Sequence, residues 1–93
     1  MRWFLYIVKC KDGSLYTGIT TNLVRRVREH NSGIGAKFLR GKLPVVMVYN
    51  EMHNSQSEAR KREEAIKKWK REHKIKLIEK GLSQTGYPSK GLP

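Results

Sequence analysis

The sequence predicts a small α/β domain in which a three-stranded, mainly antiparallel sheet is flanked by helices, in the order β-β-α-β-α-α. Two apolar runs joined by an Asp-Gly turn signal predict a β-hairpin over residues 3–19. A third apolar run begins at Pro44 and predicts another strand. Apolar residues at helical spacing fill three further stretches. Because sheets and helices each bury an apolar face, we expect the helices to cover the sheet.

The first strand, residues 3–8, should be buried on both sides. Its alternating side chains form two apolar faces: Trp3, Leu5 and Ile7 on one, and Phe4, Tyr6 and Val8 on the other. A strand that is apolar on both faces is typical of one covered by other elements on each side. The second strand is expected over residues 15–19.

The first helix is expected after three capable N-cap residues and should end near Gly33. Its caps and apolar positions are Thr20, Thr21 and Asn22, followed by Leu23, Val24 and Val27. The glycine-rich segment 33–44 reads as a loop with one helical turn around residues 36–39, and residues 44–51 read as the third strand.

A capping box formed by Ser55 and Glu58 predicts the start of the second helix. Its inner stripe is expected to contain Ala59, Arg62, Ala65, Ile66 and Trp69. A third helix is expected over residues 71–80, burying Ile75, Leu77 and Ile78. We therefore expect one domain over residues 1–80 and a disordered tail over residues 81–93.

The charge balance favours a polyanionic partner. The 93 residues include 20 Lys and Arg against 8 Asp and Glu, for a formal charge of +12. So much charge of one sign repels itself unless a partner neutralises it. Nucleic acid is the favoured partner, an anionic membrane surface is the second candidate, and a merely soluble basic protein is the third. The single cysteine, Cys10, allows no internal disulfide and no multi-cysteine zinc site, and no apolar run is long enough to span a membrane. We expect a cytoplasmic protein.

Tyr6 and Tyr16 are the first candidates for chemistry. Taken singly, a tyrosine in a strand is most often structural, with a buried ring and a wet hydroxyl. A two- or four-residue turn would put the two rings on opposite faces of the hairpin, whereas an odd-length turn or a bulge would bring them to one face. The residues alone leave this register open.

Arg26, His30 and Glu63 are further candidates. Arg26 and His30 lie four residues apart and share one helix face, where the arginine could bind a phosphate and the histidine could transfer a proton. A solvated basic face with a chance histidine is an equal alternative. Glu63 could hold one Mg²⁺, although surface pairing with Lys67 is the simpler explanation.

Together these residues resemble the GIY-YIG nuclease family. The resemblance rests on "LYIVKCKDGSLYTG" followed by "TNLVRRVREHN" and covers residues 4 to about 70. The family's two signature tripeptides correspond to residues 4–6 and 16–18, with Phe4 in place of glycine and Thr17 in place of isoleucine. We find no counterpart of the downstream Asn that some members carry. The closest likeness is to small stand-alone bacterial members.

The resemblance implies a metal-dependent endonuclease that hydrolyses DNA phosphodiester bonds, compatible with a structure-specific role in DNA repair or recombination. It assigns catalytic positions to Tyr6, Tyr16, Arg26, His30 and Glu63. Glu63 would hold a single Mg²⁺ or Mn²⁺, Arg26 would clamp a phosphate oxygen, and one phenol, assisted by His30, would position or deprotonate the attacking water. Contacts to the DNA backbone are expected from Arg25, Lys37, Arg40 and Lys42.

Two other functional classes account for part of the sequence. A non-catalytic nucleic-acid-binding module would use the same charge, but it would need neither the tyrosine pair nor Glu63. A subunit that joins a partner protein would use the apolar stretch 43–48 as an exposed edge strand.

Overall fold

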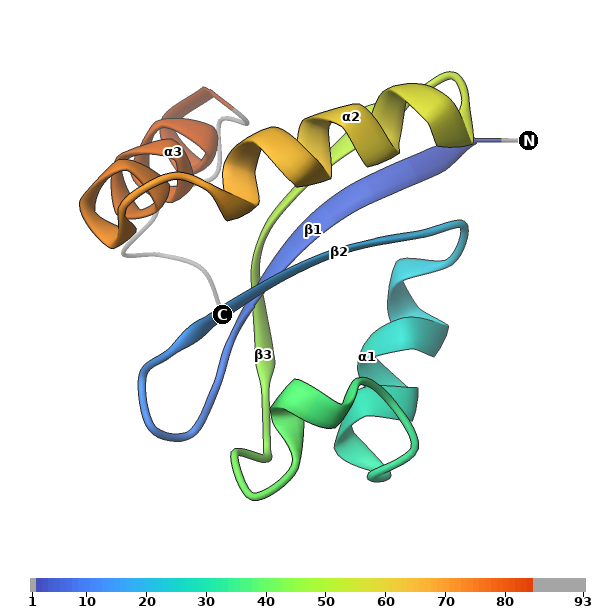
Figure 1. Cartoon of the computed structure of the whole chain (residues 1–93), viewed down its shortest axis with the longest axis vertical. Coiled ribbons are helices and arrows are strands. Elements are labelled where there is room, and N and C mark those ends of the chain that lie inside the picture. Colours follow the sequence, from blue (N-terminus) through green and yellow to red (C-terminus); the bar gives the residue numbers. More distant parts are fainter. Residues whose placement is uncertain (1, 85–93) are drawn as a thin grey trace.

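A computed structural model describes residues 2–84 of the chain (Figure 1). The order of elements is the predicted one. Their bounds are β1 Trp3–Lys9, β2 Leu15–Thr20, α1 Leu23–Asn31, the single 3₁₀ turn η1 Lys37–Leu39, β3 Val46–His53, α2 Gln56–Lys67 and α3 Arg71–Gln84. None of the helices within residues 2–84 has the length and apolarity that a membrane crossing requires. The predicted fold class is confirmed.

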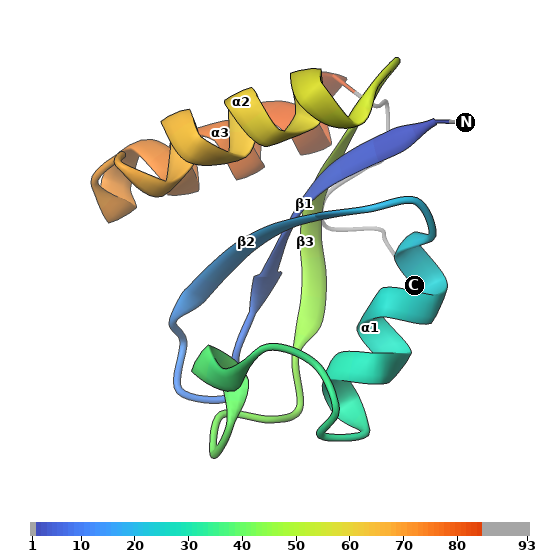
Figure 2. The ribbon, with the colours of Figure 1, turned by 45° about the vertical axis from the view of Figure 1, so that its right-hand side comes forward.

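The sheet is antiparallel throughout, with β1 in the middle and the strand order β2-β1-β3. Helices α2 and α3 lie on one side of it and α1 lies on the other (Figures 1 and 2). Leu5 and Ile7 of β1 pack with Ile66 of α2, while Tyr6 and Val8 face the layer of α1 and the loop before β3. β1 is therefore buried on both faces, as predicted, and divides two small cores.

The hairpin loop decides the register that the sequence leaves open. The Cys10 N–H donates to the Ser14 carbonyl over 2.8 Å, and the Gly13 N–H donates to the Cys10 carbonyl over 2.9 Å. Gly13 has a φ of 88°, the left-handed conformation that closes a three-residue hairpin loop. The loop length is odd, so Tyr6 and Tyr16 project from the same face of the hairpin.

Two residues expected in apolar stripes are exposed instead. Val24 is 68% exposed, because α1 turns residues 23, 26, 27 and 30 toward the sheet and Val24 falls about 100° around the helix from Leu23. Ala65 of α2 is exposed for the same reason: the inward stripe runs through residues 59, 62, 63 and 66. Each helix thus presents polar side chains to the sheet beside its apolar ones.

The third strand begins at Val46 rather than at Pro44. Both backbone groups of Val45 are bonded to Asn31, whose side-chain oxygen accepts from the Val45 N–H over 2.7 Å and whose amide donates to the Val45 carbonyl over 3.1 Å. Val45 therefore has no backbone group left for the sheet. This clamp also fixes the loop after α1.

Helix α3 continues to Gln84, four residues beyond the predicted end at Lys80. The helix continues through Gly81, where a Cβ atom would lie 2.7 Å from the Tyr49 ring. A glycine here lets α3 approach β3 closely. Residues 85–93, the rest of the predicted tail, lie outside the described residues.

Candidate functional site

The tyrosine face of the hairpin meets the inner face of α1. Tyr6 comes from β1, Tyr16 from β2, and Arg26 and His30 from α1. The ring centroids of the two tyrosines are 6.4 Å apart, and Tyr16 meets the His30 ring edge-on at 5.6 Å. The hairpin register and the four-residue helical spacing together bring these four side chains into one cluster.

The hydroxyl of Tyr6 is the centre of this cluster. It is hydrogen-bonded to Nε2 of His30 over 2.8 Å, and it accepts a longer bond, 3.4 Å, from Nε of Arg26. Tyr6 and His30 are each only 1% exposed. The phenol of Tyr6 is thus held between an imidazole and a guanidinium. The Tyr6–His30 pair is shielded from bulk water.

Two glycines make room for this pair. A Cβ atom on Gly18, the residue opposite Tyr6 on β2, would lie 2.6 Å from the Tyr6 hydroxyl oxygen. A Cβ atom on Gly35 would lie 2.0 Å from Nδ1 of His30. The Tyr6 ring therefore rests on the backbone of one glycine and the His30 ring on that of the other.

Burial favours the neutral form of both partners. It raises the pKa of Tyr6 to about 12, although the hydrogen bond from Arg26 works in the opposite direction. Burial also lowers the pKa of His30, and the nearby Arg26 charge lowers it further. His30 can therefore accept a proton through Nε2, while its Nδ1 has no hydrogen-bond partner within residues 2–84.

The guanidinium of Arg26 has two partners. Its Nε donates to the Tyr6 hydroxyl, and its Nη1 donates to Glu29 over 3.0 Å. Arg25 lies farther out, with its Nε 3.7 Å from the same carboxylate. The Arg26 side chain is about one-third exposed. Its guanidinium can therefore reach an oxyanion brought to the cluster while it keeps its bond to the phenol.

Glu63 approaches the tyrosines from α2. Its side chain is 14% exposed, and Oε2 forms an ion pair with Lys67 Nζ at 3.2 Å, so the simpler pairing considered from the sequence is formed. The same ammonium lies 5.9 Å from the centre of the Tyr16 ring. Burial is the main cause of the raised pKa of Tyr6, and the Glu63 charge is the smallest contribution in the same direction, after that of Tyr16. The Glu63–Lys67 pair therefore borders the cluster on the side of Tyr16.

The donor set at Glu63 suits a hard divalent cation that keeps most of its water. Within residues 2–84, no group of three or more His, Cys, Asp or Glu side chains could form a protein-only metal cage. Mg²⁺ commonly binds through one or two carboxylates and fills its other positions with water and substrate phosphate. A cation at Glu63 would have to displace the Lys67 ammonium from the carboxylate.

The basic residues of the loop before β3 lie beside the cluster, and one of them is held by an aromatic ring. Lys42 Nζ sits 3.8 Å from the centre of the Phe38 ring, which stacks against Tyr16 at 5.8 Å. Lys37 and Arg40 flank Phe38 and are exposed. Phe38 was not expected from the sequence at this site, and neither was Gly35. The one feature of the sequence that could have indicated a role for Phe38 is its position as an aromatic residue in the basic loop before β3.

The sequence matches the family described as the GIY-YIG catalytic domain over residues 2–76. A UPF0213 protein of Staphylococcus haemolyticus is 55% identical over 76 residues, which are 82% of this chain and 93% of that protein. A UPF0213 protein of Desulfotalea psychrophila is 52% identical over 91 residues, covering 94% of this chain and 83% of its own.

Similar folds occur in solved structures. The solution structure of a UPF0213 protein from Bacillus halodurans aligns with a TM-score of 0.57 and 40% identity, covering 96% of this chain and 90% of that one. The fold and the sequence likeness therefore extend over the same elements that carry the cluster.

Proposed function

The chain belongs to the GIY-YIG catalytic-domain family, and on that premise we propose that it is a metal-dependent endonuclease that hydrolyses phosphodiester bonds in DNA. The observation that carries the proposal is the buried bond between Tyr6 and His30, with Arg26 on the same hydroxyl. A buried phenol bound to a neutral imidazole costs desolvation, and a binding surface gains nothing from it.

Arg26 would bind a non-bridging oxygen of the scissile phosphate. Its guanidinium is partly exposed and already oriented by Glu29 and Tyr6. Negative charge grows on the phosphate oxygens as water attacks, and a fixed cation stabilises that charge more in the transition state than in the substrate.

Tyr6 would orient an attacking water that enters beside the partly exposed Arg26, because the Tyr6–His30 pair is otherwise buried, and His30 would complete the proton transfer. With a pKa of about 12, the Tyr6 phenol keeps its proton near pH 7 until an acceptor takes it. His30 is such an acceptor: as the water proton moves to the phenol oxygen, the phenol proton moves to Nε2. Tyr16, less buried and beside Lys67, would line the opposite side of the water.

Glu63 would hold one Mg²⁺ or Mn²⁺ in place of its bond to Lys67. When bound, such an ion polarises the phosphate and stabilises charge on the leaving oxygen. Lys67, released from Glu63, would remain within reach of the phosphate or of Tyr16. The DNA backbone would be contacted by the basic residues around this cluster, namely Arg25, Lys37, Arg40 and Lys42.

The test is Glu63→Gln, with Glu64→Gln as a matched control. The two substitutions change charge equally on the same helix, and Glu64 is exposed, whereas Glu63 faces the cluster. We expect Glu63→Gln to abolish Mg²⁺-dependent cleavage of a panel of branched, single-stranded and duplex DNA, while metal-free DNA affinity holds or rises slightly. Glu64→Gln should cut at the parent rate. Cleavage by Glu63→Gln at that same rate would remove Glu63 from the mechanism.

A non-catalytic nucleic-acid-binding module is the second candidate. The observation that favours it is the 3.2 Å ion pair between Glu63 and Lys67. Such a pair, four residues apart on one helix, is expected of a glutamate that only stabilises the helix. If the parent protein binds every DNA in the panel and cuts none of them with Mg²⁺ or Mn²⁺, this becomes the function.

A further inference from the structure

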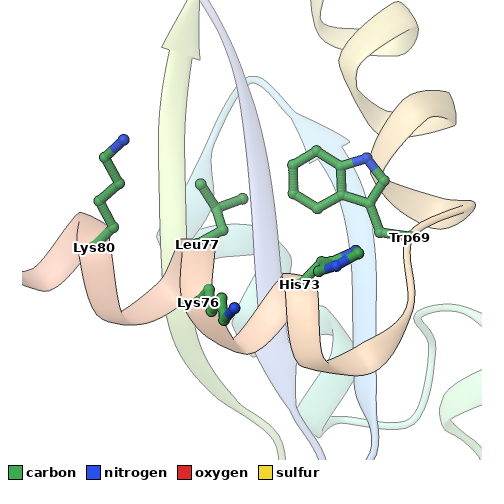
Figure 3. Close-up of a pocket in the computed structure, with 5 residues that line it drawn as sticks. All are labelled: Trp69, His73, Lys76, Leu77 and Lys80. Carbon is green, nitrogen blue, oxygen red and sulfur yellow. The ribbon is translucent and has the colours of Figure 1, made fainter.

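A separate, open cavity, which shares no lining residue with the tyrosine cluster, lies along α3 beside the segment that joins α2 to α3 (Figure 3). Trp69 comes from the segment that joins the two helices, and the other four lining residues project from α3: His73, Lys76, Leu77 and Lys80. The cavity measures about 340 Å³, within the range of small-ligand sites. It is large enough for one planar aromatic group.

The chemistry of its walls combines an aromatic surface with unpaired cations. Trp69 and Leu77 provide apolar surface, and Lys76 and Lys80 project at the rim. No lining residue is acidic, and no ion pair within residues 2–84 uses Lys76 or Lys80. Arg62, which does not line the cavity and is paired with Glu51, lies 5.4 Å from the centre of the Trp69 ring.

We propose that this cavity binds an unpaired nucleobase of a nucleic-acid strand, with the adjoining phosphates held by Lys76 and Lys80. The proposal rests on the proposed function, and it makes the preferred substrate a DNA that carries an unpaired segment separate from the cleaved bond. Aromatic rings beside a basic track are the usual means of binding single strands, because every base offers a flat face and every linkage a charge.

The charges argue against the other occupants. A second copy of this chain would bring two bodies of charge +12 together at a rim that carries only cations. A neutral apolar ligand would leave Lys76 and Lys80 without counter-charge. The spacing of these two lysines, four residues apart on α3, puts both on one helix face, where they can reach neighbouring phosphates of one strand.

The tryptophan itself reports on the site. The chain has two tryptophans, so a Trp3→Phe protein keeps Trp69 as its single indole fluorophore. In EDTA, which removes the metal ion needed for the proposed cleavage, this protein is titrated with oligothymidylate, oligouridylate, a fully paired duplex and a strand of equal length that is abasic throughout. The thymidylate and uridylate strands separate DNA from RNA as the source of the base.

We expect the thymidylate strand to quench Trp69 fluorescence. The abasic strand should bind roughly tenfold more weakly without quenching, because it keeps the phosphates and loses the stacked base. The duplex should not quench. Equal quenching by the abasic strand or the duplex, or no quenching by any strand, would overturn the proposal. Dimerisation in sedimentation without quenching would identify a second copy as the occupant.

Variants separate this site from general charge and from catalysis. Replacing Lys76 and Lys80 by Gln should weaken the thymidylate strand more than the abasic strand. Replacing Lys61 and Lys68, which are exposed and do not line the cavity, removes equal charge and should weaken both strands alike. Glu63→Gln should leave quenching intact. Quenching by a protein that never cuts DNA would contradict the nuclease while supporting this base-binding site.

Discussion

The position of the Tyr6 hydroxyl depends on two glycines as well as on its two hydrogen-bond partners. His30 and Arg26 are bonded to it, but Gly18 and Gly35 leave the space in which the phenol and the imidazole meet. Adding one methyl group to either glycine would push against an atom of the pair. The geometry of the Tyr6–His30 pair therefore requires glycine at both positions as well as the two hydrogen-bonding side chains.

The buried imidazole predicts a loss of stability below neutral pH. His30 has a lowered pKa in the folded protein, so the unfolded chain takes up its proton first as the pH falls. The contribution of His30 is fully present above its unfolded pKa of about 6.5 and declines as the pH drops through that value toward the folded pKa. We expect the urea midpoint of the parent to fall from pH 7.5 to pH 5.5.

The groups around His30 do not reverse this sign. Arg26 opposes protonation, the burial shared with Tyr6 and Tyr16 opposes it more strongly, and only Glu29 favours it. A His30→Gln protein serves as the control, and its midpoint should change less over the same pH range. An equal decline in both proteins would show that other groups cause it.

At the scale of elements, the orientation of α2 decides whether Glu63 faces the tyrosines. Glu51 on β3 accepts from Arg62 Nε over 2.9 Å, from the Tyr49 hydroxyl over 2.5 Å and from His53 Nε2 over 2.6 Å. Although burial opposes it, these hydrogen bonds hold the pKa of Glu51 below its usual value. Because Arg62 directly precedes Glu63, the bond fixes the rotation of the helix that carries the proposed metal ligand.

Arg62→Met should therefore loosen α2. The half-buried Glu51 carboxylate would lose its charged partner, and we expect a loss of about 1–2 kcal/mol in the free energy of unfolding, measured in urea. Cleavage should fall as well, with weaker Mn²⁺ binding, because Glu63 is less well oriented.

Arg25→Met is the matched control. It breaks the 3.7 Å ion pair between Arg25 and Glu29. Because the Arg25 side chain is mostly exposed, the free energy of unfolding should fall by less than about 1 kcal/mol. If both variants lose the same stability, the bond between α2 and β3 has no special role.

For the molecule as a whole, the net charge of +12 on 93 residues is the property that most directly predicts binding to a polyanion. The cations come from several elements, and the exposed Lys37 and Arg40 flank the turn η1 next to the cluster. Charge spread in this way gives affinity that is independent of base sequence.

DNA affinity should therefore fall steeply as salt rises, in proportion to the number of phosphates neutralised. Replacing Lys37 and Arg40 together by Gln should weaken all DNA sequences to a similar extent and reduce the slope of log affinity against log salt by roughly two. Filter binding of two unrelated sequences over a salt series measures both effects. A slope that stays at the parent value would place these two side chains outside the DNA contact.

The elements and their order can be predicted from the chain alone, because the signals for them are local. Alternation in β1, the cap of Asn22 on the Arg25 N–H and the cap of Ser55 on the Glu58 N–H all act within a few residues. The signature tripeptides likewise identified Tyr6 and Tyr16 by position alone. Local signals also placed Arg26 and His30 on one helix face.

How these elements fit together depends on contacts between residues that are far apart in the chain. The hairpin register depended on the conformation of residues 11–13, for which the sequence allowed odd and even turns alike. The start of β3 depended on Asn31, fourteen residues before Val45, and Gly81 lies within α3, packed closely against the Tyr49 ring of β3. Contacts between residues distant along the chain leave no periodic trace in the sequence, so the pairing of Tyr6 with His30 and the place of Phe38 beside Tyr16 came from packing in three dimensions.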